Sequence, residues 1–422
     1  MSMRLGWISF ACLIAASCAG SEREPSATAM PPDGPATAST PQPSAAGSSA
    51  NDSSGPARSA NATPERPPAT SGAMTKPSGP ADTAGAAAPA TTPSPAAPSG
   101  AAGSTPATST PSTSKPPAMP GPAAPAVDAQ PTLFFLNNLG QVVSARDDGS
   151  ERRVIVSNAG SGPDGIAVDV KRGFVFWTNM GVPSADDGTI MRADLDGKNL
   201  TTIVKSGGTF TPKQLKIDPE HGKLYWSDRE GMRVMRVDID GSNIETLIQT
   251  GKTDADRSDG SRWCVGIAID VAGGKLYWTQ KGGDNAHVGT IKRAGLDLPA
   301  GQDAATRTDI EVLFAKLPEP IDLDLDLDEH RIYWTDRGDN TVSRAALDAA
   351  AGFDPAARTD REILVRGLNE AIGLSLDPSN DRMFYTSLGG IVASAKLDGS
   401  MARNVLSGQG ALTGITLVDV PK

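Results

Sequence analysis

Cysteine and histidine are scarce in this sequence of 422 residues, which contains three of each. The cysteines are Cys12, Cys18 and Cys264, and the first two belong to an N-terminal segment that resembles a secretion signal. A mature chain would keep Cys264 alone in its folded part, which excludes an intramolecular disulfide framework. The sequence also has no nucleotide-binding loop, zinc-ligand spacing or nucleophile elbow.

Large apolar side chains are missing from a long stretch near the N-terminus. Residues 19–130 contain no Ile, Leu, Phe, Trp or Tyr and consist almost wholly of Ala, Pro, Ser, Thr and Gly. Such a segment cannot bury a core, so we expect residues 18–130 to be a disordered tether.

Clusters of basic residues are absent as well. The formal net charge is −10, and most of it falls on residues 131–422. An acidic domain without basic clusters argues against nucleic acid as a partner. We expect a monomeric chain.

The first 17 residues have the pattern of a signal peptide. Arg4 precedes an apolar run from Leu5 to Ala16, which is too short to span a bilayer. The sequence Ala15-Ala16-Ser17-Cys18 resembles the lipobox of bacterial lipoproteins, which implies lipid attachment at Cys18. The same resemblance implies a bacterial cell envelope, with Ala19 favouring the outer membrane, and membrane contact through the anchor alone. The alternative is an ordinary cleaved signal with an incidental cysteine.

An aromatic tetrad recurs five times between residues 176 and 387. Its second aromatic recurs after 49, 52, 56 and 51 residues, and each interval has room for four short strands, the size of one propeller blade. The tetrads are Phe176-Trp177-Thr178-Asn179, Tyr225-Trp226-Ser227-Asp228, Tyr277-Trp278-Thr279-Gln280, Tyr333-Trp334-Thr335-Asp336 and Phe384-Tyr385-Thr386-Ser387.

A short apolar strand that ends in Asp precedes every tetrad. The Asp always lies seven residues before the first tetrad aromatic, and the gap reads as the turn of a hairpin. A third strand with period-2 alternation follows each tetrad, and a fourth strand completes the blade. The acid-terminated strands are Gly165–Asp169, Gln214–Asp218, Gly266–Asp270, Asp322–Asp326 and Gly373–Asp377.

Residues 131–422 resemble the Tyr-Trp-Thr-Asp (class B) repeats of the low-density-lipoprotein receptor family. The resemblance implies an all-β fold, a six-bladed β-propeller. It says little about function, because that family binds many partners and this chain lacks the cysteine-rich modules that flank the receptor propellers.

The two ends of the domain account for the sixth blade. Residues 133–137 look like a tetrad strand with no acid-terminated strand before it, and residues 414–418 look like that missing strand. We therefore predict that the C-terminal strand closes the first blade, which removes open sheet edges. The alternative is a stack of unclosed repeats.

Two innermost strands break a rule of small residues. Aligned at their closing Asp, the other strands carry small side chains at two positions on one face, where these two carry Gln214 and Lys216, and Asp322 and Asp324. These side chains are expected to line the axial channel. Unpaired charges there are costly, so we predict a Lys216–Asp324 interaction or a small cation or polar ligand on the carboxylates. A calcium ion is not favoured, because too few oxygens are at hand. The alternative is a polar channel that satisfies itself.

A long polar loop, residues 251–263, ends in a tryptophan without counterpart in the other blades. Because it precedes an innermost strand, the loop should lie on the channel-entry face. Glu319 and Glu370 hold the position of Trp263 in two other blades, and Lys213 lies nearby in a third. We predict ligand binding by these residues, with Trp263 as a hot spot. The alternative is a Trp packed under its own loop.

The sequence favours the first of three functions. The first is a surface-anchored module that binds a protein, peptide or glycan through its entry face, without a cofactor. The second is a secreted propeller enzyme, lactonase-like or lyase-like, for which His287 is the one histidine expected near the entry rim. The third is a purely structural envelope protein.

Overall fold

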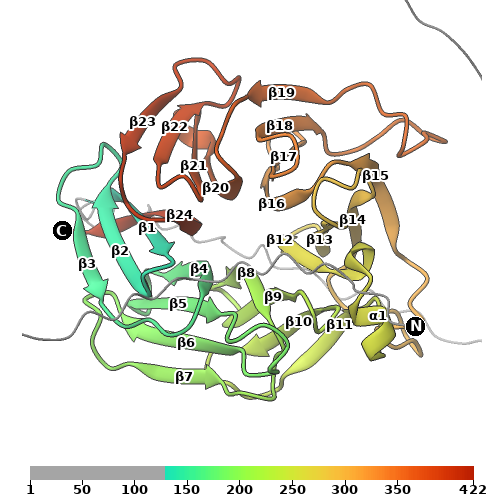
Figure 1. Ribbon diagram of the computed structural model, residues 1–422, viewed down its shortest axis with the longest axis horizontal. Coiled ribbons are helices and arrows are strands. Elements are labelled where there is room, and N and C mark those ends of the chain that lie inside the picture. Colours follow the sequence, from blue (N-terminus) through green and yellow to red (C-terminus); the bar gives the residue numbers. More distant parts are fainter. Residues whose placement is uncertain (1–128) are drawn as a thin grey trace, which may run out of the picture. The chain divides into compact units, whose positions relative to one another are not determined.

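Residues 129–422, the part of the chain that the computed structural model describes, form six four-stranded antiparallel sheets around a central axis (Figure 1). The predicted signal peptide, Cys18 and the tether up to residue 128 lie outside the described residues, whereas the last two residues of the predicted tether, Ala129 and Gln130, belong to a strand. The fold is the predicted all-β, six-bladed propeller. Within the described residues, no helix has the length and apolarity needed to cross a membrane.

Each blade is built outward from an acid-terminated or C-terminal strand. We number as blades 1 to 5 the sheets β4–β7, β8–β11, β12–β15, β16–β19 and β20–β23, and as blade 6 the sheet β24-β1-β2-β3. The innermost strands are β4 (Pro163–Asp169), β8 (Pro212–Asp218), β12 (Cys264–Asp270), β16 (Pro320–Asp326), β20 (Ala371–Asp377) and β24 (Leu412–Pro421). The second strands, which carry the tetrads, are β5 (Phe174–Asn179), β9 (Lys223–Asp228), β13 (Lys275–Gln280), β17 (Arg331–Asp336), β21 (Arg382–Ser387) and β1 (Ala129–Asn137).

The outermost strand of each blade is more exposed than the two inner strands. The third strands are β6 (Thr189–Asp194), β10 (Arg233–Asp238), β14 (Gly289–Gly295), β18 (Thr341–Ala346), β22 (Val392–Lys396) and β2 (Gln141–Arg146). The outermost strands are β7 (Thr201–Val204), β11 (Glu245–Gln249), β15 (Glu311–Leu317), β19 (Glu362–Val365), β23 (Arg403–Leu406) and β3 (Arg153–Val156). The described helices are the short α1 (Asp254–Arg257), η1 (Gly260–Arg262) and η2 (Pro378–Asn380).

The two ends of the domain close the ring as predicted. Strand β24 pairs antiparallel with β1, and Leu133 lies opposite Leu417 and Phe135 opposite Ile415 (Figure 1). Strand β1 begins at Ala129, two residues before the predicted domain boundary. The C-terminus therefore supplies the innermost strand of blade 6.

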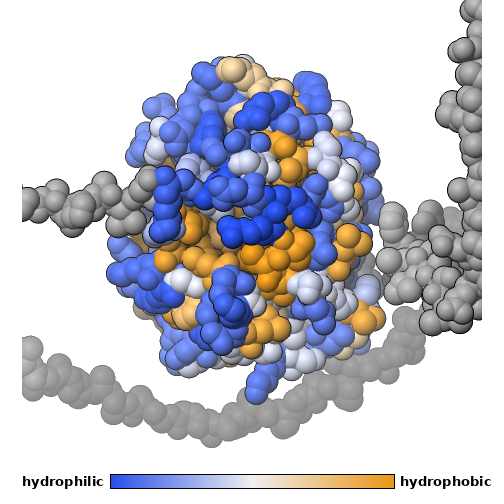
Figure 2. Space-filling view, turned by 90° about the vertical axis from the view of Figure 1, so that its left-hand side faces the viewer, coloured by the Kyte–Doolittle hydropathy of each residue, from blue (hydrophilic) through white to orange (hydrophobic). Residues whose placement is uncertain are grey.

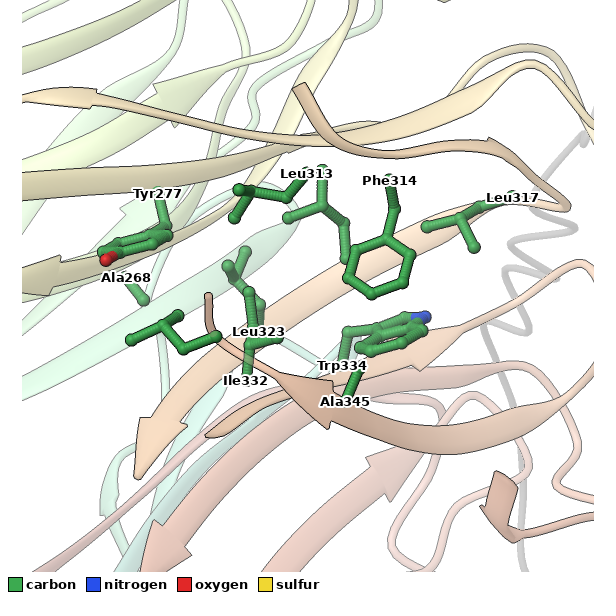
Figure 3. Packing of buried hydrophobic residues seen from close by; sticks show 11 residues of the cluster. Ala268, Tyr277, Leu313, Phe314, Leu317, Leu323, Ile332, Trp334 and Ala345 are labelled. Atoms are coloured by element: carbon green, nitrogen blue, oxygen red, sulfur yellow. The ribbon is translucent and has the colours of Figure 1, made fainter. Parts of the chain in front are cut away.

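The tetrad aromatics fill the interfaces between blades. Neighbouring residues of a strand point to opposite faces, so Tyr277 of blade 3 packs toward blade 4 while Trp278 packs toward blade 2. Figure 3 shows the interface between blades 3 and 4, where Phe314 of β15 lies against Trp334 of β17 with ring centroids 5.0 Å apart. The two tetrad aromatics thus pack against the neighbouring blades on both sides.

The tetrad hydroxyl joins each blade to the next. Thr335 Oγ1 accepts a hydrogen bond from the Asp322 N–H of its own blade and donates to the Ile372 carbonyl of the following one, at 2.6 Å. Thr178, Ser227, Thr279 and Thr386 donate to the following blade in the same way. Blade 6 has Leu136 at this position, and there Thr413 Oγ1 donates to the Pro163 carbonyl at 2.9 Å. Hydrogen bonds of this kind therefore link all six blades, including blade 6, which both chain ends build.

A glycine turn between the third and fourth strands presses against the preceding blade. A Cβ atom at Gly197 would lie 1.8 Å from the Ile155 carbonyl oxygen of β3, and Gly149, Gly241 and Gly399 sit in the same way. Blades 3 and 4 carry insertions here. Arg307 and Arg358 donate instead to the corresponding carbonyls, those of Leu247 and Leu313. Every blade thus contacts the equivalent carbonyl in the outermost strand of the preceding blade, either through a closely packed glycine or through a hydrogen bond from an arginine.

Replacing one of these glycines by alanine is expected to destabilise the domain. Gly197→Ala combines a left-handed backbone, φ 82°, with a collision against a neighbouring blade, for a total of about 2–4 kcal/mol. Gly173→Ala is the matched control, because Gly173 has φ 76° and open space around the Cβ position, which leaves the backbone cost of about 1 kcal/mol. Denaturant unfolding measures both. Equal losses would contradict a role for the inter-blade contact.

A groove lies between blade 6 and the neighbouring blade 1. It has a volume of about 460 Å³ and is lined by Phe134, Val154, Ile155 and Val420 among others, with Arg146 and Glu151 at its rim. Figure 2 views this side of the molecule, where β3 and the C-terminus lie, and shows apolar surface between hydrophilic side chains. The groove is remote in sequence from the predicted entry-face residues.

Candidate binding site at the channel entry

The loops on one face of the ring surround the mouth of the axial channel. These loops join the second strand to the third, and the fourth strand to the innermost strand of the next blade. A small cavity of about 50 Å³ lies at this mouth. It is lined by Lys213, Arg229, Val265, Lys281, Ile321, Arg337 and Ile372. We call these residues the channel mouth.

The floor of the channel mouth is apolar and its wall is basic. Val265, Ile321 and Ile372 occupy the same position in β12, β16 and β20 and pack together as one buried cluster. Arg229, Lys281 and Arg337 each directly follow a tetrad, in blades 2, 3 and 4. The equivalent residues of blades 1 and 5 are Met180 and Leu388. The residue after the tetrad is therefore basic in three consecutive blades and apolar in the two blades that flank them.

Buried carboxylates hold the cations in place from behind. Glu319, with a side chain 2% exposed, accepts from Lys281 at 2.5 Å and pairs with Arg337 at 2.8 Å. Asp164, 1% exposed, pairs with Lys213. The side chains of Arg229 and Arg337 are more exposed, at 21% and 26%, and Arg337 also pairs with the exposed Asp284 at 2.7 Å. A ligand would meet these two arginines first, already fixed by their partners.

The pKa values at the mouth follow from burial and pairing. Burial lowers the pKa of Lys213 below its usual value, although Asp164 opposes this shift. Burial alone would raise the pKa of Glu230, but Arg229 beside it holds that pKa below the usual value. The hydrogen bond from Lys281 likewise lowers the pKa of Asp284. These acids therefore stay ionised at neutral pH and keep the arginines and lysines oriented.

Trp263 lies beside the channel mouth and is half-buried. Its indole Nε1 donates to the Arg257 carbonyl of its own loop at 2.9 Å. Its ring faces two mouth cations, with Arg229 Cζ 5.3 Å and Lys281 Nζ 5.5 Å from the ring centroid. The indole is thus held by its own loop, as in the alternative of a packed Trp, and two mouth cations lie over its ring.

The other predicted entry-face residues take different positions. Lys213 and the buried Glu319 belong to the mouth wall and its support. Glu370 sits at the rim with φ 56° and lies 3.5 Å from Arg337. His287 is exposed on the loop between β13 and β14, where its backbone N–H donates to the Pro318 carbonyl. Among the described residues, no recorded side-chain hydrogen bond joins His287 to an acid or a base.

The polar side chains of the channel divide into two groups. Gln214 turns to Asp164 of blade 1, with Nε2 3.2 Å from Oδ1. Lys216 Nζ lies 3.4 Å from Asp324 Oδ1, so of the two predicted arrangements the described residues contain the direct ion pair. The Asp322 and Asp324 carboxylates also accept from the Leu374 and Leu376 N–H groups of the next blade, at 2.9 and 3.1 Å.

Burial and neighbouring charges in the channel shift the pKa values of Asp322 and Lys216. Burial raises the pKa of Asp322 to about 7, while Asp324 and Asp322 together raise the pKa of Lys216 against the opposing effect of burial. Within residues 129–422 no group of three or more His, Cys, Asp or Glu side chains is placed to hold a metal ion. Asp324 pairs with Lys216, and both carboxylates accept backbone N–H groups of blade 5.

Asp336, the last residue of the blade 4 tetrad, is a buried carboxylate that lacks the cationic partner of its counterpart. In blade 2, Asp228 pairs with Arg233 at 2.6 Å, whereas Thr341 stands at that place in blade 4. Asp336 Oδ1 accepts from the Glu319 N–H, and Oδ2 has no partner. Burial and the nearby Asp339 raise the pKa of Asp336 to about 7.

The raised pKa of Asp336 predicts that the domain loses stability as pH rises from about 4 to about 7. An unfolded Asp titrates near 3.9, so in this window the folded state holds the extra proton and the slope of the unfolding free energy is negative. Asp336→Asn is expected to remove up to about 1.4 kcal/mol per pH unit of this slope. The exposed Asp240→Asn is the control, because the pKa of Asp240 is lowered and this carboxyl therefore titrates below the pH window. Denaturant unfolding at several pH values measures the slopes, and unchanged slopes in Asp336→Asn would contradict the assignment.

Three cations of the channel mouth were not predicted from the sequence. Arg229, Lys281 and Arg337 lie one residue beyond the tetrad, outside the innermost strands whose side chains were compared. The signal was nevertheless present, because the residue after the tetrad is basic in three consecutive blades and apolar in the two beside them.

Fold and site together define the protein as a six-bladed β-propeller of the Tyr-Trp-Thr-Asp type with a basic, partly apolar channel mouth. The chain is 43% identical over 291 residues to low-density lipoprotein receptor-related protein 1 of Pyricularia oryzae, and the match covers 66% of this chain and 92% of that protein. The chain therefore belongs to the low-density-lipoprotein-receptor-related β-propeller family. No protein-family model matches it.

A second relative shares part of its length with this chain. The 3-hydroxyacyl-CoA dehydrogenase-like protein LAM1 of Cochliobolus heterostrophus is 38% identical over 312 residues. That match covers 69% of this chain and 66% of LAM1, just under two thirds of the relative.

Solved structures support the fold. A chain of the nidogen/laminin complex superposes with a TM-score of 0.52 at 21% identity, covering 68% of this chain and 98% of that one. TolB from Acinetobacter baumannii has a TM-score of 0.50 at 14% identity, covering 68% of this chain and 66% of that one. At these identities the likeness concerns the fold alone.

Proposed function

We propose that this propeller is a binding module whose channel mouth recognises an acidic side chain of a protein or peptide. The observation that carries the proposal is the pair of partly exposed arginine side chains, Arg229 and Arg337, each paired with a largely buried acid beside an apolar floor. Arginine in such a setting suits a carboxylate. Complementary charge of this kind supports recognition and fast association.

The size of the mouth favours a macromolecular ligand. A cavity of about 50 Å³ admits the end of one side chain, whereas pockets for small molecules hold about 300–1,000 Å³. A protruding acidic residue would enter the mouth, and the surrounding loops, with Trp263 among them, would contact the rest of the ligand. Aromatic and arginine side chains are the residue types that most often dominate binding energy.

A peptide array tests the proposal. Short synthetic peptides of acidic, neutral and basic composition are probed with the purified chain, and acidic peptides are expected to bind. Arg229→Gln, which keeps a donor for Glu230, is expected to lower their affinity about 10-fold or more, because a hydrogen bond to a charged group contributes about 1.5–3 kcal/mol. Arg403→Gln, on the exposed strand β23, is the matched control.

The outcome distinguishes the classes of ligand. Equal affinity of the wild type and Arg229→Gln for acidic peptides would show that the channel mouth does not bind them. Binding of sulfated glycans without any peptide would replace the proposed ligand class by acidic glycans.

We further propose that Cys18 carries a lipid and anchors the propeller to a bacterial outer membrane through residues 18–130. The motif around Cys18 supports this, and two or three acyl chains would hold the chain stably. Loss of the protein from the membrane fraction in Cys18→Ser tests the anchor. Equal membrane retention in both forms would contradict it.

A further inference from the structure

A second hollow lies on the channel-entry face, beside the mouth. It has a volume of about 310 Å³ and is formed by the loops of residues 205–211, 229–232 and 250–257. Its lining includes Phe210, Met232, Arg233, Gln249, Lys252 and Arg257, with Asp186 as the acidic residue of the lining. We call it the lateral pocket.

Two of the three cations in the lateral pocket lack a buried acid. Arg233 is neutralised by Asp228 at 2.6 Å. Arg257 has only the fully exposed Asp254 at 3.4 Å, and its guanidinium lies 4.1 Å from the Phe210 ring centroid. Lys252 is exposed, and no side-chain hydrogen bond or close ion pair is recorded for it in the described part of the chain. The pocket thus offers positive charge beside an aromatic wall.

The lateral pocket and the channel mouth share one set of contacts. The Arg257 guanidinium donates to the Glu230 carbonyl, and the Glu230 carboxylate pairs with Arg229 of the mouth. The Arg257 carbonyl in turn accepts from the Trp263 indole. Trp263 therefore stands between the two basic sites and is held by residues of both.

We propose that the ligand carries two acidic side chains, one for the channel mouth and one for the lateral pocket. This proposal rests on the proposed function. The segment between the two acids crosses Trp263, and apolar groups next to the second acid contact Phe210 and Met232. A second charge-assisted contact gives selectivity for a pair of acids at one spacing, because a ligand with a lone acid brings no carboxylate to Lys252 and Arg257.

Synthetic peptides with one glutamate, or with two glutamates at every separation, test this proposal on the purified full chain. At one range of separations the second glutamate is expected to strengthen binding about 10-fold or more. Lys252→Glu is expected to abolish this gain and to leave binding of the one-glutamate peptides unchanged. Lys171→Glu, which reverses an exposed lysine in the β4–β5 turn on the other face, makes the same change in net charge and is the control.

The possible results separate the two proposals. Binding of one-glutamate peptides that gains nothing from a second glutamate at any separation overturns the lateral pocket and leaves the mouth intact. A gain that survives Lys252→Glu, or that Lys171→Glu also removes, overturns it as well. Failure of every acidic peptide to bind overturns the mouth and the lateral pocket together.

Discussion

Removal of the C-terminal strand is expected to unfold the propeller. A chain that stops after Gly410 lacks β24, so blade 6 loses its innermost strand and the ring opens. Leu412 and Ile415 are buried with Leu133 and Phe135 in one cluster. Loss of one large buried aliphatic side chain costs about 2–5 kcal/mol. Two of them, together with the strand pairing, match the whole stability of about 5–15 kcal/mol of a typical domain.

The control for this truncation is a chain that stops after Val418. It keeps Ile415 and Leu417 opposite Phe135 and Leu133 and is expected to unfold cooperatively near the wild-type temperature. Circular dichroism with thermal unfolding follows both chains. A cooperative transition at the wild-type temperature in the chain that ends at Gly410 would contradict the closure mechanism.

Replacement of Lys213 by methionine is expected to cost about 3–5 kcal/mol, because it leaves a buried carboxylate without its cation. Asp164 is 1% exposed and pairs with Lys213. Its remaining side-chain partner is the neutral amide of Gln214. Methionine keeps the length of the side chain, so the loss reports the charge rather than the packing.

The double variant Lys213→Met, Asp164→Asn separates charge from shape. It is expected to recover most of the lost stability, because no charge stays buried alone. Denaturant unfolding of the two single variants and the double variant gives the coupling energy. Additive losses in the double variant would show that the two side chains do not act as a pair.

The repeats made the fold predictable. The tetrad aromatics and the closing Asp residues mark strands at fixed spacing, and this spacing decides blade size without any knowledge of contacts. The closure was visible because residues 133–137 and 414–418 complement each other. The pattern does not contain the register between blades, so the hydrogen bonds that the Leu374 and Leu376 N–H groups donate to Asp322 and Asp324 could not be predicted.

The site was predictable only in part. The entry face followed from strand order, which placed Trp263, Glu319 and Lys213 near the mouth. Their environments did not follow, because burial depends on neighbouring loops. The loop of residues 251–263 forms α1 and η1, and Arg257 accepts the indole hydrogen of Trp263 through its carbonyl. Glu319 looks like an exposed acid in the sequence and is buried by Lys281 and Arg337.

Tryptophan emission tests most directly whether ligands bind at the channel mouth. Trp177, Trp226, Trp278 and Trp334 are fully buried, so Trp263 is the indole of the described residues that an entering ligand can reach. An acidic peptide that binds the chain is expected to change the emission of the wild type and to leave Trp263→Phe unchanged. Calorimetric binding of that peptide without any change in wild-type emission, or an equal change in Trp263→Phe, would contradict the site.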